Sequence, residues 1–251
     1  VIDKPKNTFS EQALMAAAKI NYKTENYESA LLNYQKLDQI AEVNNHLIES
    51  RIGQLRSNYN LEDYNKVIEN ADKVLHTEKI SGELKREAHY KKGKALHNLK
   101  NNELALDEFR IISEEVNSRE GAESKYLICD IYFNDNQFDV AEHEIFDFAA
   151  QNTSQEYWLA KSFILLSDVY LKKDDKFQAT HTLKSIIENY NPDANDEIVS
   201  LATEKYNSIV EEEELKIEQK KESDELKLNF EENTEGQYDE LFKEKSDTIN
   251  F

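Results

Sequence analysis

Six histidines are the residues that would first suggest acid–base catalysis or metal binding, but their spacing favours neither. A zinc site on one helix face needs two histidines four residues apart beside a glutamate. The stretch AEHEIF around His143 comes nearest to this pattern and contains only one histidine. We therefore interpret all six as surface or interhelical side chains: His46, His76, His89, His97, His143 and His181.

The other residue types that carry chemistry are equally isolated. Cys129 is the only cysteine, which excludes an intramolecular disulfide, and we expect it to be a buried, unreactive thiol. The five glycines form no phosphate-binding loop. The stretch NDNQFD, Asn134 to Asp139, lacks the central glycine and the distal glutamate of a calcium loop. We predict no catalytic site, no cofactor and no metal, and therefore a chain that is not an enzyme.

Composition narrows the partners and the fold class. The 251 residues include 31 basic and 51 acidic side chains, a formal net charge of −20 that repels nucleic acid and anionic membrane surfaces. No apolar run approaches the ~20 residues of a spanning helix, so we expect no membrane insertion. Only 5 glycines and 2 prolines argue against a turn-rich β fold. The sequence predicts an all-α protein.

Short polar breaks recur along the chain between two apolar helical periods. The stretch Lys172 to Lys176 is one such break, and a small residue follows each break at the start of the second period. These small residues are spaced by 37, 38, 36 and 38 positions: Ala30, Val67, Ala105, Ala141 and Ala179. Self-similarity at this period indicates an array of helix–turn–helix repeats.

Specific positions resemble the tetratricopeptide repeat family. In the fifth unit Phe163, Leu166, Ser167 and Tyr170 match its first helix, and the second helix matches at Ala179, Leu183, Ile186 and Pro192. Repeats of 36–38 residues resemble those of bacterial envelope proteins and of multi-repeat proteins from Bacteroidetes. The resemblance implies a right-handed α-solenoid of five antiparallel helix pairs over residues 1–194. It also implies a protein-binding scaffold, with a bacterial periplasm or cell envelope as the expected setting.

The end of the chain departs from the repeat. Residues 195–228 are expected to form a capping helix that continues as a solvated helix, with Glu212 and Lys216 paired across one turn. Residues 229–251 are expected to be an acidic tail, extended or docked.

In the tetratricopeptide family the first helix of each pair lines a concave groove, and the resemblance transfers three rows of groove positions to this chain. The first row is cationic in repeats one to three and anionic in repeats four and five, and the second row is mostly aromatic. The third row consists of Met15, Ile52, Tyr90, Tyr126 and Ile164. The partner-binding residues implied in this way are Lys19, Tyr22, Arg56, Tyr59, Tyr90, Lys94, His97, Tyr126, Asp130, Phe133 and Asp168.

Three functions remain open at this point. The first is a scaffold whose groove binds a protein segment with an acidic half facing Lys19, Arg56 and Lys94 and a basic half facing Asp130 and Asp168. The second is a self-assembly or autoinhibited module, a possible homo-oligomer, whose acidic tail docks into its own or a neighbour's groove. The third is a regulatory part of an enzyme or transporter, which no residue pattern favours.

Blander interpretations of the groove rows also remain. The charged row could be a solvated face, and the third row, which contains Tyr90 and Tyr126, could belong to the core. The second interpretation has a specific reason, because the neighbouring core position is polar in the middle repeats, at Arg51, His89 and Lys125.

Overall fold

The structure is a computed structural model that describes the backbone of residues 8–191 and 196–247 and the side chains of residues 9–191 and 196–225. Over these residues it contains eleven α-helices and no β-strand, so the all-α prediction is confirmed. The chain divides into two compact units, Val1–Asp175 and Lys176–Phe251.

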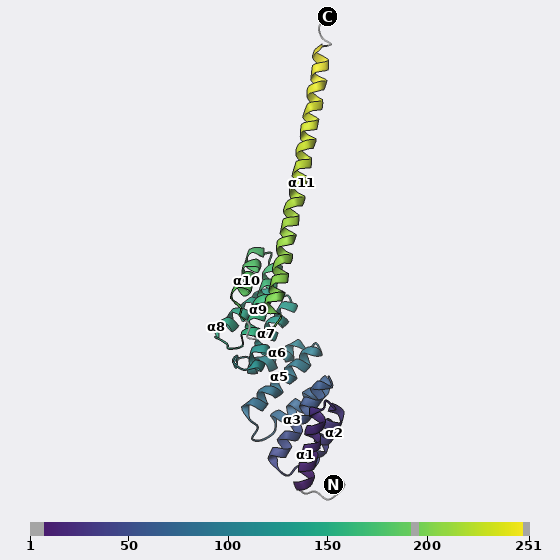
Figure 1. Ribbon diagram of the computed structural model, residues 1–251, viewed down its shortest axis with the longest axis vertical. Helices are drawn as coiled ribbons and strands as arrows, with labels where there is room; N and C mark the ends of the chain where they lie inside the picture. The colour runs from purple at the N-terminus through teal and green to yellow at the C-terminus, as the bar shows by residue number, and fades with distance from the viewer. Residues whose placement is uncertain (1–7, 192–195, 248–251) are drawn as a thin grey trace. The chain divides into compact units, whose positions relative to one another are not determined.

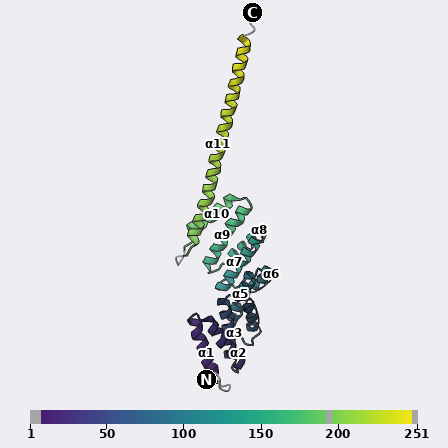
Figure 2. The same cartoon turned by 90° about the vertical axis from the view of Figure 1, so that its right-hand side faces the viewer.

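The first unit is a stack of helices in chain order (Figure 1), and a view from the side shows the same order (Figure 2). Each expected pair of the first four repeats is present as two consecutive helices in contact. The helices are α1 Thr8–Lys23, α2 Tyr27–Ile40, α3 Asn44–Asn60, α4 Tyr64–Leu75, α5 Gly82–Asn98, α6 Asn102–Ile112, α7 Arg119–Asn134, α8 Phe138–Ala150 and α9 Glu156–Lys172.

The first helices of successive pairs form an inner layer of this unit. Helix α1 contacts α3, α3 contacts α5, α5 contacts α7, and α7 contacts α9. The second helices α2, α4, α6 and α8 make no such contacts with one another over the described residues. A stack in which one layer is closer together than the other must curve toward the closer layer, which gives repeat arrays their concave surface.

Each polar break is a tight turn with the same geometry. One residue of every turn has a positive φ between 57° and 63°, and the second helix starts two residues after it. These residues are Glu25, Glu62, Lys100, Asn136 and Asp174. The following N–H donates to the carbonyl five residues back, as Asp63 does to Asn58 at 3.1 Å. This is a Schellman ending of the first helix. Asn26 and Asp63 then cap the second helix through their side chains.

The recurring small residues lie in the core, as the repeat predicted. Ala30, Val67, Ala105 and Ala141 are fully buried. The polar core positions of the middle repeats are satisfied by ion pairs within the array. Arg51 donates to Asp38, His89 lies 2.7 Å from Glu108, and Lys125, which is 4% exposed, donates to Glu144 and Asp147 at 2.9 and 2.5 Å. Because removal of its acidic partners would leave a buried charge at Lys125, this position specifies the neighbouring helix α8 as well as filling space.

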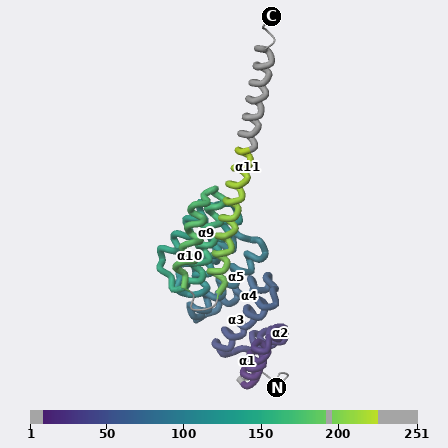
Figure 3. The backbone as a smooth tube through the Cα atoms, turned by 45° about the horizontal axis from the view of Figure 1, so that its top comes forward, coloured from purple at the N-terminus to yellow at the C-terminus, as the bar shows by residue number. Residues whose placement is uncertain are grey.

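The second unit contains α10 Lys176–Asn189 and α11 Ile198–Asp247, which contact each other; Figure 3 shows α10 beside the start of α11. Ala179, Leu183 and Ile186 of α10 and Ile198 and Ala202 of α11 are buried. The Asp196 carboxylate accepts from the Ile198 N–H at 3.1 Å and thereby caps α11.

Helix α11 differs from the expected end of the chain. The predicted ion pair between Glu212 and Lys216 is present. However, the helix does not end near residue 228 but continues through Asp247, so residues 229–247 are helical rather than extended. Five of the 19 residues in this segment are glutamates, which are strong helix formers. Docking of the tail falls on side chains outside the described residues.

Candidate functional site

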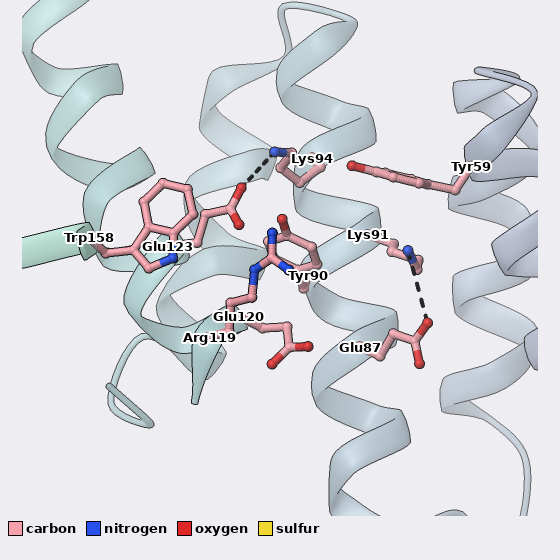
Figure 4. A pocket seen from close by; sticks show the side chains of 9 residues that line it. All are labelled: Tyr59, Glu87, Tyr90, Lys91, Lys94, Arg119, Glu120, Glu123 and Trp158. Carbon is pink, nitrogen blue, oxygen red and sulfur yellow. Dashed lines mark hydrogen bonds and ion pairs between the residues drawn. The ribbon is translucent and has the colours of Figure 1, made fainter. Parts of the chain in front are cut away.

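A pocket of about 420 Å³ opens on the inner layer of the first unit. Its lining comes from four successive first helices, α3, α5, α7 and α9 (Figure 4). Three aromatic side chains surround a set of charged groups; the lining residues are Tyr59, Glu87, Tyr90, Lys91, Lys94, Arg119, Glu120, Glu123 and Trp158.

The three glutamates of the pocket are each engaged by a cation. Glu87 accepts two hydrogen bonds from the Arg56 guanidinium, at 2.7 and 2.6 Å. Glu123 is almost fully buried and accepts from the Lys94 ammonium at 2.8 Å. Glu120 lies 3.5 Å from Arg86. A bidentate arginine–carboxylate pair and a buried lysine–carboxylate pair are the stronger kinds of ion pair, so Glu87 and Glu123 are already compensated, whereas Glu120 is compensated less.

Two cations of the pocket have no comparable partner. The Lys91 ammonium lies 4.0 Å from Glu87, at the limit of an ion pair, and 4.0 Å from the ring centroid of Tyr59. Burial lowers the pKa of Lys91, because little in its surroundings replaces the water that a charged ammonium loses. Arg119 is exposed at the start of α7 and has neither a hydrogen bond nor an ion pair to the described residues. Its side chain projects toward Tyr90 in Figure 4.

Tyr90 forms the floor between these groups. Burial raises the pKa of its hydroxyl well above the ordinary value, and the negative charge of Glu123 raises it further. Tyr90 therefore stays a neutral donor, and its ring offers an apolar surface within a charged pocket.

The three cations of the predicted groove row bind glutamates of the next first helix. Each of these glutamates precedes the small residue of its own repeat by the same 18 positions. The row therefore forms a ladder of ion pairs between consecutive repeats, with nitrogen–oxygen distances of 2.9 Å for Lys19 and Glu49, 2.6 Å for Arg56 and Glu87, and 2.8 Å for Lys94 and Glu123.

The same arrangement explains why the row changes sign in the fourth repeat. Lys161 occupies the glutamate position of the fifth repeat, and the row position that faces it is Asp130. Burial raises the pKa of Asp130, whereas the charges of His97 and Lys161 act in the opposite direction. The sign pattern thus follows the inter-repeat partners within the chain.

An aromatic cluster lies at this inverted step. The Lys161 ammonium lies between 5.3 and 5.6 Å from the ring centroids of Tyr126, Tyr157 and Trp158. Tyr126 and Trp158 are themselves in contact, with ring centroids 5.6 Å apart. The cluster joins α7 to α9 and forms one wall of the inner surface.

The remaining predicted groove residues make contacts within or between repeats. The Tyr22 hydroxyl accepts from Asn60 at 2.8 Å, and His97 lies 3.1 Å from the Asn102 amide oxygen. Phe133 packs against Phe138 of its own repeat, with their ring centroids 5.7 Å apart. Asp168 is half-buried on α9.

The structure brings three of the predicted residues, Tyr59, Tyr90 and Lys94, into one pocket. The third row of transferred positions is divided between pocket and core, because Tyr90 lines the pocket whereas Ile52 and Ile164 are buried. Sequence reasoning missed Lys91, Arg119 and Trp158, together with the glutamates that pair with the cationic row. The glutamates could have been found from the sequence, because each precedes the small residue of its repeat by 18 positions. Lys91 lies at none of the three transferred row positions.

Among the described side chains, no three or more histidine, cysteine, aspartate or glutamate residues are arranged to bind a metal ion. Cys129 is fully buried, and burial raises the pKa of its thiol to about 12. Over the described part of the chain, no helix has the length and apolar character needed to cross a membrane.

Comparison with known proteins identifies the fold. No protein-family model and no curated protein matches the chain. Among solved structures, residues 41 to the end of MamA from Desulfovibrio magneticus RS-1 superpose with a TM-score of 0.56 at 20% identity, over 71% of this chain and 93% of that chain. A second MamA structure gives a TM-score of 0.53 at 14% identity, over 73% and 97%.

YrrB, described as a tetratricopeptide repeat protein with an unusual peptide-binding site, superposes with a TM-score of 0.54 at 19% identity, over 77% of this chain and 90% of that chain. At these identities the likeness concerns the fold. Together with the recurring helix pairs and the inner layer of first helices, it shows that this chain has the tetratricopeptide-repeat fold.

Proposed function

We propose that this chain is a non-catalytic scaffold that binds a peptide or protein segment on the inner surface formed by its first helices. The observation that carries this proposal is the pocket across α3, α5, α7 and α9, where aromatic rings and charged groups are open to a ligand. Aromatic side chains give a large contact area at low entropic cost, which suits the capture of a peptide. Fold alone does not fix function, so the proposal depends on this site.

The likeness to tetratricopeptide-repeat structures supports both parts of the proposal, a binding surface and the lack of catalysis. The segment runs across the repeats, with Tyr59, Tyr90 and Trp158 as apolar contacts. The ion-pair ladder holds the inner surface in shape, while the cationic half of the groove centres on Lys91 and Arg119. Asp130 and Asp168 remain the predicted contacts for a basic half of the segment.

Site-specific photo-cross-linking tests the proposal. The photoreactive residue p-benzoylphenylalanine replaces Trp158 in the pocket or, as the matched aromatic control, Phe146 on α8, which is 49% exposed. After irradiation in the source cell's extract, we expect a discrete protein adduct from position 158 and none from position 146. Adducts of equal yield from both positions, or none from position 158, would contradict binding on the inner surface.

The bacterial periplasm or cell envelope stays a predicted setting. Immunoblotting of fractionated source cells with an antibody against this chain checks it, and a cytoplasmic signal would contradict it.

A further inference from the structure

The pocket contains positive charge that the chain itself does not neutralise. Arg56 and Lys94 are bound to Glu87 and Glu123 at hydrogen-bond distance, so these glutamates have little to offer a further cation. Lys91 is left with a contact of 4.0 Å, and Arg119 with no ion pair among the described residues. Both side chains line the same pocket.

The desolvation of Lys91 adds to this argument. Its side chain is 16% exposed, so its ammonium has lost much of its water. The Tyr59 ring face compensates only in part, since a cation–π contact contributes about 0.5–2 kcal/mol. A negative group that enters the pocket would complete the coordination of the Lys91 ammonium. Because folding has already removed most water from this ammonium, little further desolvation of Lys91 opposes binding.

The rest of the pocket limits the kind of anion. Glu120 lies in the lining and is only 3.5 Å from Arg86 rather than at hydrogen-bond distance, so its charge opposes a strongly negative ligand. A phosphate group carries about −1.5 to −2 at neutral pH, whereas a carboxylate carries a single charge. The rings of Tyr90 and Trp158 provide an apolar surface beside the cations.

We propose that this pocket receives the carboxylate of a glutamate or aspartate within the partner segment, bound by Lys91 and Arg119, with an adjoining apolar side chain against Tyr90 and Trp158. The inference rests on the proposed function and names the chemistry that its site selects. It is a demanding selection, because the net charge of −20 repels acidic peptides at long range. At physiological salt that repulsion is screened beyond about 8 Å, so the local cations decide the outcome.

Selection from a random decapeptide library displayed on phage tests this inference with the full chain. The variants are Arg119→Gln and Lys91→Met, the second of which keeps an unbranched apolar chain over Tyr59. The matched control is Lys85→Gln, an exposed lysine on α5 that lies outside the pocket. Circular dichroism shows whether each variant is folded. If Lys91→Met does not fold, the test rests on Arg119→Gln.

We expect wild type and Lys85→Gln to enrich peptides with an acidic residue beside an apolar one. A fluorescein-labelled selected peptide should bind at least ten times more tightly than its counterpart with glutamine or asparagine at the acidic position. Arg119→Gln should reduce that preference at least fivefold.

Two results would overturn the inference, and they differ in what they say of the proposed function. Enriched peptides without acidic residues, or an acidic preference that survives in Arg119→Gln and Lys91→Met, would reject the carboxylate site but leave peptide binding in place. If no peptide is enriched on wild type, both the carboxylate site and binding of a short segment are rejected.

Discussion

At the residue scale, what the pocket can bind depends on which of its charged side chains are already paired within the protein. Arg56 and Lys94 lie at groove positions, yet each is bound to a glutamate of the next repeat. Lys91 and Arg119 lie outside the three transferred rows. Neither has a close acidic partner among the described residues, so each can bind a negative group of a ligand. The position of a residue in its repeat therefore indicates whether its side chain faces the inner surface. Whether a charged side chain there can bind a ligand depends on whether it is already paired with an opposite charge of the protein.

A second feature at this scale is the close approach of backbone to Gly121 in the first turn of α7. A Cβ atom at this position would lie 2.3 Å from the Glu115 carbonyl oxygen. We expect Gly121→Ala to lower the free energy of unfolding by about 1–3 kcal/mol, because backbone must move to accept the methyl group. Urea unfolding followed by circular dichroism measures the change.

Gly82→Ala is the matched control for this substitution. Gly82 begins α5, and nothing lies within 4 Å of the position that its Cβ would take. Alanine there should leave stability unchanged or raise it by up to about 1 kcal/mol. Equal effects of the two substitutions would show that the approach of the Glu115 carbonyl does not constrain Gly121.

At the element scale, the five turns between first and second helices share one backbone geometry without using glycine. Glu62 has a φ of 57°, in the left-handed region that disfavours residues with a Cβ. We expect Glu62→Gly to raise the free energy of unfolding by about 0.5–1 kcal/mol, after the greater chain entropy of glycine is subtracted. Chemical denaturation is the measurement.

Glu62→Ala separates this backbone effect from the loss of a charge. It removes the same carboxylate but keeps the Cβ, so no stabilisation by relief of backbone strain is expected. If alanine stabilises the protein as much as glycine does, the gain comes from reduced charge repulsion and the backbone explanation is wrong.

The sequence predicted the helices better than it predicted what joins them. The spacing of Ala30, Val67, Ala105 and Ala141 was enough to place the pairs, because only small residues fit at those crossings. The turn geometry could not be predicted from the sequence, because the usual indication of a left-handed residue is a glycine. Here residues such as Glu62 and Lys100 occupy those positions instead. The acidic composition of residues 229–251 suggested an extended or docked tail, whereas α11 continues through Asp247.

The site was predicted in part for a related reason. The transferred groove positions include Tyr59, Tyr90 and Lys94, which line one pocket. Lys91 and Arg119 could not be found in this way, because their importance depends on the absence of close acidic partners in three dimensions. The pairing of Lys94 with Glu123 joins residues 29 positions apart and belongs to the stacking of repeats.

At the scale of the whole molecule, the net charge and the site act in opposite directions. A chain with a net charge of −20 repels acidic partners in general, which suppresses non-specific association with them. A pocket within such a surface that holds Lys91 and Arg119 without close acidic partners favours a ligand that places one carboxylate there. The inner layer of first helices makes this possible by bringing α3, α5, α7 and α9 to a single opening.

The most direct test of the central claim, that the partner binds at this pocket, is quantitative affinity capture from the source cell's extract. Wild type is compared with Arg119→Glu and with Lys85→Glu, which change the net charge equally but differ in their place relative to the pocket. The account predicts that a captured partner is lost from Arg119→Glu and retained by Lys85→Glu. Capture of the same partner in equal amount by all three proteins would contradict it.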